Sequence, residues 1–315
     1  MASGDAFPGF SPDFRAALER LSLAPRRPAG GLFAGDARSR ARGRALEFAE
    51  HRPYVPGDDP RLVDWRAYSR LDRLYVKQFE EERGRTLTLL VDASASLDWG
   101  GSPAGGGGSP AAGWGGESDR EAHKGRFARR LAAALAWVAL SRHDAVRAFL
   151  LRDGQALRLP PATSRPAAGA LLAELGAVRE GGSTELAAAV RASRSGWGAG
   201  PLLLLSDLLD PTWAAALDPL AASGEGVVVQ VLAPEEWSPS LGDEVELEDA
   251  ETGERRETRL GPLELAAYRA RLEAHLGAVE AACRRLDLRY AALDTGRPLP
   301  EIVLRQLVEA GILAG

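Results

Sequence analysis

The chain of 315 residues is long enough for one large α/β domain with an appended segment, or for two modest domains. Apolar residues make up 45% and charged residues 26%, which is typical of a globular protein that folds by hydrophobic burial. The formal net charge of −5 argues against nucleic acid as a partner, because binding to phosphates needs a basic surface. The one basic cluster, Arg38 to Arg44, lies near acidic segments, and we interpret it as a solvated or salt-bridged stretch.

Cysteine usage and apolar segment length bear on the cellular compartment. The lone cysteine, Cys283, excludes an internal disulfide and fits a reducing compartment. It lies in a helical pattern without a nearby histidine, which favours a packed thiol over a nucleophile. The first ten residues lack the basic start and apolar core of a signal peptide, and the longest apolar stretch, Leu131 to Ser141, is too short to span a bilayer. We therefore expect a soluble, cytoplasmic protein without a membrane span.

The first 85 residues are predicted to form an N-terminal block, rich in turns and mixed charges, that packs on the main domain. Within this block Pro56 and Gly57 predict a turn, and we interpret Trp65 as a packing anchor. The main domain is predicted over residues 86–315. It begins with a strand over 86–92, followed by a mobile loop rich in glycine and serine over 99–118.

From there, strands and helices alternate along the chain. Helices are predicted over 120–144, 164–178, 184–194, 211–223, 263–288 and 300–311. Hairpins are predicted over 145–160 and 244–260, and single strands over 201–207, 226–234 and 289–295. Several of these strands are almost entirely apolar, which is typical of a parallel sheet covered on both faces. The predicted fold is a doubly wound, mostly parallel α/β sheet with one antiparallel hairpin strand, an inserted hairpin and the N-terminal block.

Oxygen-bearing side chains gather where the predicted strands end. Asp92 ends the first strand of the main domain, and Ser94 and Ser96 follow it at alternate positions. Asp207 ends the strand over 201–207, and Thr184 lies in a Gly-rich loop just before a helix. Because ligands bind beyond the carboxyl ends of the strands in such sheets, we expect these five residues at one edge.

This set holds two carboxylates and three hydroxyls, with no histidine or thiol. Hard oxygen ligands suit Mg²⁺, Mn²⁺ or Ca²⁺ and disfavour zinc. If the chain stays extended past Asp92, the alternation places Asp92, Ser94 and Ser96 on one side of it. The alternative is that the two serines only cap the following loop or helix. We favour a cation site, because Asp207 and Thr184 stand at matching strand ends.

Several of these segments resemble a known family. "DASAS" (92–96), "GGSTEL" (181–186) and "LLLLSDLLD" (202–210) resemble the metal-ion-dependent adhesion site of von Willebrand factor A domains. The block "GRALEFAEHRPYVPGDDPRLVDWRAYSRLDRLYVKQFEEE" (43–82) resembles the domain of unknown function 58 family, bacterial proteins that carry such a domain. The resemblance runs from about Gly35 to the C-terminus, and it includes "DAETGERRE" (249–257) and the strand end at Asp294.

The resemblance implies a von Willebrand factor A-like, Rossmann-type fold and a magnesium site. In that site Ser94 and Ser96 are the direct ligands, while Asp92, Thr184 and Asp207 complete the coordination directly or through water. Because Ser183 precedes Thr184, the third hydroxyl ligand is either of these two residues. The Gly-rich loop that follows Asp98 departs from the family pattern. Family members often accompany MoxR-type AAA+ ATPases, which implies a role in the assembly or activation of other proteins.

Three functions are compatible with this site. In a metal-dependent protein-binding module, few anionic ligands leave the cation partly unneutralised, so a partner's Asp or Glu supplies the last coordination position. That partner would be a MoxR-type AAA+ ATPase or its client. A metal-assisted phosphohydrolase would need a nucleophile or base beside the metal, and the sequence shows no such catalytic pattern. The third function is a structural scaffold with an empty site. We expect the binding module and not an enzyme.

Overall fold

The computed structural model describes residues 10–24, 47–53, 75–80, 85–100, 122–239, 245–248, 255–258 and 261–315. The chain divides into two compact units, one of Met1–Arg26 with Arg85–Gly315 and one of Arg27–Gly84. Residues 10–24 therefore belong to the larger unit, although the sequence placed them in the N-terminal block. Three of the predicted features lie outside the described residues: Trp65, the turn at Pro56 and most of the loop over 99–118.

In the smaller unit, strands β2 (Glu47–Pro53) and β3 (Tyr75–Glu80) pair antiparallel, with a register shift between Phe48 and Glu50. In the larger unit, helix α1 (Pro12–Leu18) begins after Ser11, whose side chain accepts a hydrogen bond from the Phe14 amide. This short helix was not predicted.

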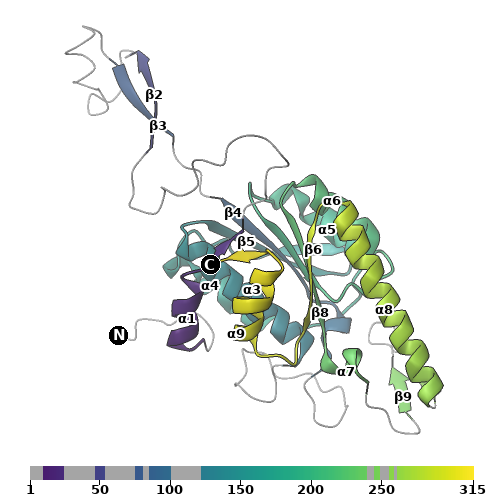
Figure 1. The fold of residues 1–315 in the computed structure, drawn as a ribbon. Helices are drawn as coiled ribbons and strands as arrows, with labels where there is room; N and C mark the ends of the chain where they lie inside the picture. Colours follow the sequence, from purple (N-terminus) through teal and green to yellow (C-terminus); the bar gives the residue numbers. More distant parts are fainter. Residues whose placement is uncertain are drawn as a thin grey trace. The chain divides into compact units, whose positions relative to one another are not determined.

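The larger unit is a mixed α/β fold around a six-stranded sheet (Figure 1). The strand order is β11-β8-β7-β4-β5-β6, and all neighbours run parallel except β5 and β6. The strands are β4 (Thr86–Asp92), β5 (Ala145–Arg152), β6 (Gln155–Arg158), β7 (Leu202–Ser206), β8 (Gly226–Leu232) and β11 (Arg289–Asp294). The prediction of a mostly parallel sheet with one antiparallel hairpin strand is confirmed. Asp153 and Gly154 make the turn of that hairpin, both with positive φ.

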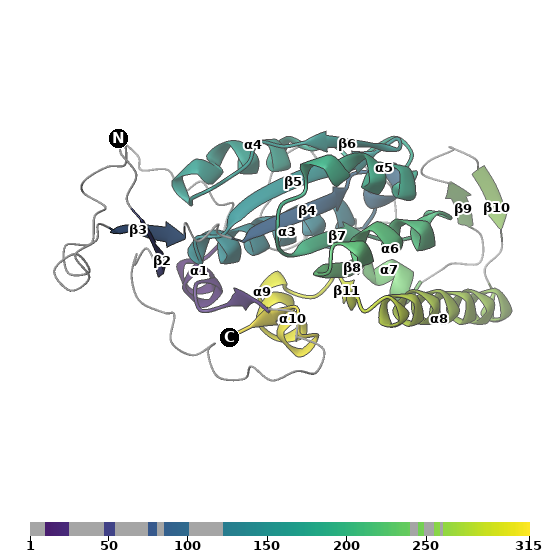
Figure 2. The same cartoon turned by 90° about the horizontal axis from the view of Figure 1, so that it is seen from above.

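Helices lie on both faces of the sheet (Figure 2). The longer ones are α3 (Lys124–Ser141), α4 (Gly169–Ala177), α5 (Leu186–Ser193), α6 (Trp213–Ala222) and α8 (Pro262–Arg285). Short helical elements are α7 (Pro234–Trp237), α9 (Leu299–Glu301), α10 (Leu307–Glu309), η2 (Ala95–Leu97), η3 (Pro166–Ala168), η4 (Arg194–Gly196) and the π-helical η5 (Ile302–Gln306). The predicted C-terminal helix is therefore interrupted by a wider π turn.

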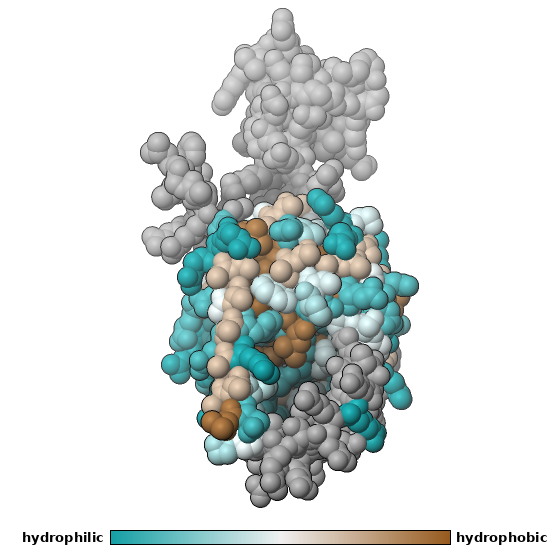
Figure 3. All heavy atoms as spheres, turned by 90° about the vertical axis from the view of Figure 1, so that its right-hand side faces the viewer, coloured by the Kyte–Doolittle hydropathy of each residue, from teal (hydrophilic) through white to brown (hydrophobic). Residues whose placement is uncertain are grey.

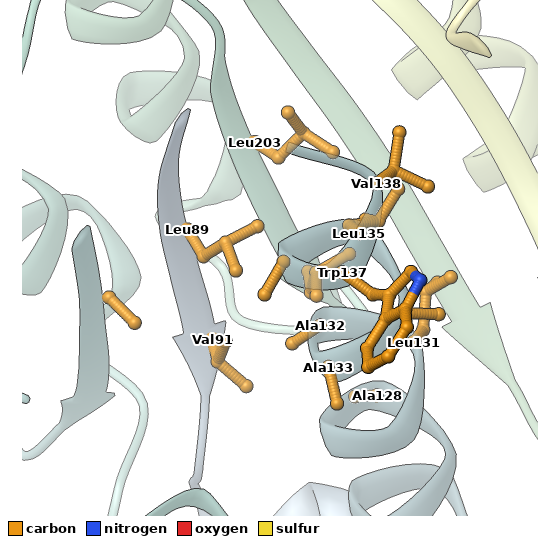
Figure 4. Close-up of a cluster of buried hydrophobic side chains, with 14 of the residues drawn as sticks. Leu89, Val91, Ala128, Leu131, Ala132, Ala133, Leu135, Trp137, Val138 and Leu203 are labelled. Atoms are coloured by element: carbon orange, nitrogen blue, oxygen red, sulfur yellow. The ribbon is translucent and has the colours of Figure 1, made fainter. Parts of the chain in front are cut away.

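Alternate residues of the central strands enter two separate hydrophobic cores. Leu89 and Val91 of β4 pack with α3 and α4, whereas Leu90 packs with α5, α6 and the end of α8. Figure 4 shows Leu89 and Val91 beside the helix that carries Ala132 and Leu135. Because both faces are covered, every residue of β4, β7 and β8 is buried, which explains their nearly uniform apolar sequences.

In the larger unit, a short strand near the start of the chain pairs with a short strand near its end. Strand β1 (Ser22–Leu23) pairs antiparallel with β12 (Leu313–Ala314), and the Ser22 hydroxyl donates to the Ala314 carbonyl at 3.4 Å. Arg142, just after α3, donates to the carbonyls of Arg20 and Leu21. These contacts hold residues 10–24 against the end of α3.

Helix α8 is largely exposed along its length. Of its residues only Val279, Ala282 and Cys283 are buried, and Leu263 in its first turn is 80% exposed. Burial raises the pKa of the Cys283 thiol to about 12, so this residue is the packed thiol that the sequence predicted. Figure 3 shows a face on which hydrophilic side chains alternate with small hydrophobic patches.

A second hairpin precedes α8 in the sequence. Strands β9 (Val245–Glu248) and β10 (Arg255–Thr258) pair antiparallel within the range predicted for an inserted hairpin. Across the described part of the chain, no helix combines the length and the apolar character needed to cross a membrane.

Candidate metal centre

The carboxyl ends of β4 and β7 are neighbours in the sheet. Their parallel register pairs Val91 with Leu205, so Asp92 and Ser206 follow at adjacent positions. The chain builds β5 and β6 on one side of β4, and then returns to build β7, β8 and β11 on the other side. Ligands of parallel sheets bind where the order reverses in this way. The structure thus brings Asp92 and Asp207 to the expected edge.

Asp92 is buried and accepts hydrogen bonds on both carboxylate oxygens. Oδ1 accepts from the Ser94 amide at 3.0 Å and from the Ser94 hydroxyl at 2.7 Å, while Oδ2 accepts from the Ser206 hydroxyl at 2.6 Å. Burial, followed by the carboxylate of Asp207, raises the pKa of Asp92 to about 7, although the bonds from Ser206 and Ser94 oppose the shift. The charged form of Asp92 is therefore disfavoured, because no cationic side chain among the described residues forms a hydrogen bond with it.

The two serines come together through a turn and not through an extended strand. Strand β4 ends at Asp92, Ser94 is still extended, and the 3₁₀ helix η2 then carries Ser96. The condition that the chain stays extended past Asp92 holds only as far as Ser94, because η2 bends the backbone immediately after it. The two hydroxyl oxygens nevertheless lie 3.0 Å apart. The Ser94 side chain makes no capping hydrogen bond and donates to Asp92, which does not support the capping alternative for this serine.

The Gly-rich loop before α5 lies against the segment that follows β4. The Gly181 amide donates to the Ala93 carbonyl at 3.0 Å, and the Ala95 amide donates to the Gly182 carbonyl at 3.0 Å. Gly182 has a φ of +72°, a conformation that favours glycine. These two backbone bonds bring Thr184, two residues further along, to the same edge as Asp92.

Ser183 and Thr184, the two candidates for the third hydroxyl, have different surroundings. The amide and the hydroxyl of Ser183 both donate to Asp153 Oδ1, at 2.8 and 3.2 Å. Ser183 is half-buried, and these two bonds hold it at the turn between β5 and β6. Thr184 is only 2% exposed. The threonine is the one that lies within the protein at this edge.

Asp207 has a partner that Asp92 lacks. Its Oδ2 accepts from the Lys124 ammonium at 2.8 Å, and its Oδ1 accepts from the Leu209 amide at 3.2 Å. The Lys124 and Asp207 side chains are each 1% exposed. The same ammonium donates to Glu236 Oε1 at 2.8 Å, so that it bridges two carboxylates. This buried ion pair is the main electrostatic feature of the site.

The pKa of Lys124 shows which effect prevails. Burial alone would lower it, but the carboxylates of Asp207 and Glu236 together raise it above its ordinary value. The pKa of Glu236 is raised by burial, with Lys124 acting in the opposite direction. Glu236 Oε2 also accepts from the Ala233 amide at 2.7 Å, which fixes this carboxylate at the start of α7. Lys124 therefore stays protonated.

Backbone contacts explain why Lys124 reaches this position. Its amide donates to the Trp99 carbonyl at 2.8 Å. His123 precedes it as the N-cap of α3, with Nδ1 accepting from the Arg126 amide and Nε2 lying 3.0 Å from Asp98 Oδ1. Burial lowers the pKa of His123, although Asp98 opposes this. The segment after β4 and the start of α3 are thus held together.

Sequence reasoning missed Lys124, Glu236 and Ser206. A signal existed for Lys124, because the helix that follows a parallel strand begins at the edge where that strand ends. Ser206 was also visible, since it immediately precedes Asp207. Glu236 could not have been chosen, because nothing in its local sequence relates it to Lys124.

The donors at this edge combine hydroxyls with carboxylates, and one cavity lies away from them. Among the described residues, no group of three or more His, Cys, Asp or Glu side chains is placed to hold a metal ion. A cavity of about 660 Å³ lies between β6 and the end of α4, with Leu150 and Arg152 in its lining. Arg152 connects this cavity to the segment after β4, because its Nε donates to the Ala93 carbonyl at 3.1 Å.

Comparison with known proteins gives a family. Residues 50–105 and 108–277, more than half of the chain, match the family described as "Protein of unknown function DUF58". The chain belongs to this family. It is also 28% identical over 312 residues to the uncharacterized proteins Rv1480 of Mycobacterium tuberculosis and Mb1516 of Mycobacterium bovis. The match covers 96% of this chain and 92% of each relative.

Two solved structures are similar over much of the chain. They are the conserved hypothetical protein BatB from Bacteroides thetaiotaomicron and an aerotolerance-related membrane protein from Bacteroides fragilis. Their sequence identities are 14% and 12%, and their TM-scores are 0.37 and 0.36. Each match covers 72% of this DUF58 protein and 98% of the other chain.

Proposed function

We propose that the edge formed by β4 and β7 binds a divalent cation, and that the bound cation takes up an Asp or Glu side chain of a partner protein. The charge balance of the site carries this proposal. Among the described residues, the Lys124 ammonium bonds to the buried Asp207 and to the largely buried Glu236, whereas buried Asp92 accepts no bond from a cationic side chain. Burial makes an ionised carboxylate costly when no positive charge lies beside it. A divalent cation beside Asp92 would supply that positive charge.

The side chains at this edge suit such a cation. Asp92, Ser94, Ser96, Thr184 and Asp207 would hold it, directly or through water. Serine and threonine hydroxyls with carboxylates are hard oxygen donors, which favour Mg²⁺ or Mn²⁺ and also accept Ca²⁺. The cation would supply positive charge to the edge and an attachment point for an anionic side chain. Serine and threonine hydroxyls are neutral, so they leave most of that positive charge in place.

The sequence motifs support the finer part of the proposal. The likeness of residues 92–96 and 181–186 to von Willebrand factor A domains supports a metal-ion-dependent adhesion site. The likeness to the domain of unknown function 58 family supports a MoxR-type AAA+ ATPase, or its client, as the partner. Binding is favoured over hydrolysis because position 94, where a phosphohydrolase of the haloacid-dehalogenase type needs an aspartate, is a serine.

The first experiment measures whether metal stabilises the protein. Binding to the folded state alone adds roughly 1.4 kcal/mol to the free energy of unfolding when Mg²⁺ is present at about ten times its Kd. Asp92→Ala should abolish this gain, whereas Asp218→Ala, at an exposed position of α6, should retain it. Thr184→Ala should also remove the gain, and Ser183→Ala should not. Thermal unfolding with Mg²⁺ and with chelator provides the measurement, and identical midpoints in both would contradict a metal site.

The second experiment tests the partner. A purified MoxR-type AAA+ ATPase should bind the protein in Mg²⁺, and chelator or Ser96→Ala should abolish binding while circular dichroism stays unchanged. Capture that is indifferent to metal would contradict the proposed contact. Metal-dependent hydrolysis of phosphate or ester substrates that Asp92→Ala removes would establish an enzyme instead.

A further inference from the structure

Both oxygens of Asp207 accept a hydrogen bond, and one of these bonds comes from a charged group. Oδ2 accepts from the Lys124 ammonium and Oδ1 accepts from the Leu209 amide. In contrast, the hydrogen bonds of Asp92 come from a backbone amide and from the hydroxyls of Ser94 and Ser206. The two aspartates at this edge therefore present different charges to any ion that enters.

The Lys124 ammonium is held firmly in its position. It makes two bonds of 2.8 Å, to Asp207 and Glu236, and the lysine side chain is 1% exposed. Glu236 is in turn fixed at both ends. Its carboxylate accepts from the Ala233 amide, and its backbone carbonyl accepts from the Tyr268 hydroxyl of α8 at 2.8 Å. Displacing the ammonium would leave two poorly exposed carboxylates without a counter-charge, which is strongly unfavourable.

We propose that Lys124 is a resident cation that sets the charge of the metal centre and thereby its preference for an acidic ligand. This inference rests on the proposed function. Lys124 is shared between Asp207 and Glu236 and weakens the negative charge that Asp207 presents at this edge. Among the described residues, Asp92 is then the main anionic side chain that a bound divalent cation would meet. The cation consequently keeps net positive charge and accepts a carboxylate from outside. Lys124 is in this sense a specificity-determining residue, although it need not touch the metal.

The same ammonium should weaken the binding of the metal itself. Divalent cation sites gain affinity with each anionic ligand, and a nearby positive charge opposes binding through the poorly polarisable interior. Without Lys124, Asp207 would be free to act as a second anionic ligand. The metal would then be held tightly and largely neutralised, with little remaining attraction for an acid.

The experiment compares three proteins by calorimetric titration with Mn²⁺ at neutral pH. Wild type should bind Mn²⁺ measurably. Lys124→Met combined with Glu236→Gln removes the ammonium and its second partner together, which leaves the net charge of the cluster unchanged, and should lower the Kd for Mn²⁺ tenfold or more. Glu236→Gln alone leaves Lys124 with a single carboxylate, makes the cluster more positive, and should raise the Kd several-fold.

Acetate serves as the probe for the acidic ligand, with acetamide as its neutral control. Acetate at tens of millimolar should tighten Mn²⁺ binding to wild type, because two ligands that attract each other at a site strengthen each other's binding. It should have no such effect on the double variant, whose metal is already neutralised. An equal effect of acetate on both proteins would overturn the specificity role.

The outcomes distinguish a failure of the proposed metal centre from a failure of the proposed role of Lys124. No Mn²⁺ binding by wild type overturns both the metal centre and the role of Lys124. Binding by wild type with an unchanged or raised Kd in the double variant overturns only the role of Lys124, which would then merely position Asp207. If circular dichroism shows that the double variant does not fold, Glu236→Gln decides alone. A raised Kd supports the proposal, and an unchanged or lowered one overturns it.

Discussion

The ends of β4 and β7 carry one buried aspartate each, but the two aspartates differ in charge partner. Asp92, the last residue of β4, is 2% exposed, and Asp207, which follows β7, is 1% exposed; both strands are buried throughout. Asp207 pairs with an ammonium, whereas Asp92 accepts bonds from an amide and hydroxyls and has a pKa raised to about 7. Equivalent positions in the sheet therefore do not confer equivalent chemistry.

The difference arises from the helix that follows β4 in the chain. After β4 the chain enters α3, whose first residue, Lys124, reaches across to Asp207 and not to Asp92. Burial makes an unpaired carboxylate costly. Asp92, which accepts no bond from a lysine, is therefore the aspartate that an added cation would stabilise most. The three predictions that follow test this asymmetry.

The largest effect is expected from removing the ammonium. Lys124→Met would leave Asp207 and Glu236 without their shared counter-charge, and should lower the free energy of unfolding in chelator by about 3–5 kcal/mol. Urea unfolding monitored by circular dichroism measures this loss. Arg284→Met breaks a fully formed but exposed pair with Glu280 and should change stability little. Equal losses in the two variants would mean that burial does not distinguish these pairs.

A smaller effect is expected from the pH response of Asp92. Its pKa rises from 3.8, the ordinary value, to about 7 in the folded protein. Well below the unfolded pKa of 3.8 the carboxyl group is protonated in both states and contributes nothing. As the pH rises from 4 to 7 the unfolded chain releases its proton first, so it binds fewer protons than the folded state and stability falls. The full cost, on the order of a few kcal/mol, is present well above pH 7.

Asp92→Asn removes this titration. In chelator the variant should therefore gain stability relative to wild type as the pH increases from 4.5 to 8. Urea unfolding at several pH values supplies the comparison, with Asp218→Asn, at an exposed position, as the control that should follow wild type. Parallel curves for wild type and Asp92→Asn would show that Asp92 ionises as readily as an exposed aspartate.

The smallest effect is expected from the side-chain hydrogen bonds that hold the end of β7. Tyr290 of β11 donates to Gln230 Oε1 at 2.7 Å, and Gln230 Nε2 donates to the Asp207 carbonyl at 2.7 Å. Tyr290→Phe should cost about 1 kcal/mol in the free energy of unfolding, the usual contribution of one such hydrogen bond. Its pH profile should match that of wild type, because Asp92 is braced by other residues. A changed pH profile would indicate that the two strand ends act as one unit.

Local sequence determined much of the fold. Nearly uniform apolar runs identified β4, β7 and β8 as strands covered on both faces, because only such strands exclude polar side chains throughout. The hairpin predicted over 145–160 turns at Asp153 and Gly154, two residue types that readily adopt positive φ. The positions of Asp92 and Asp207 at strand ends followed directly. The short helix α1 was missed because it gains its stability from packing and not from its own seven residues.

The tertiary structure alone decided the electrostatics of the site. Lys124 meets Asp207 across 83 positions of sequence and Glu236 across 112, and no local pattern encodes either pair. The 3₁₀ turn that brings the hydroxyls of Ser94 and Ser96 together likewise depends on the loop at Gly181 and Gly182, which is hydrogen-bonded beside it. Secondary structure follows from neighbours in sequence, whereas the charge around a buried carboxylate follows from the side chains that the folded chain brings to it.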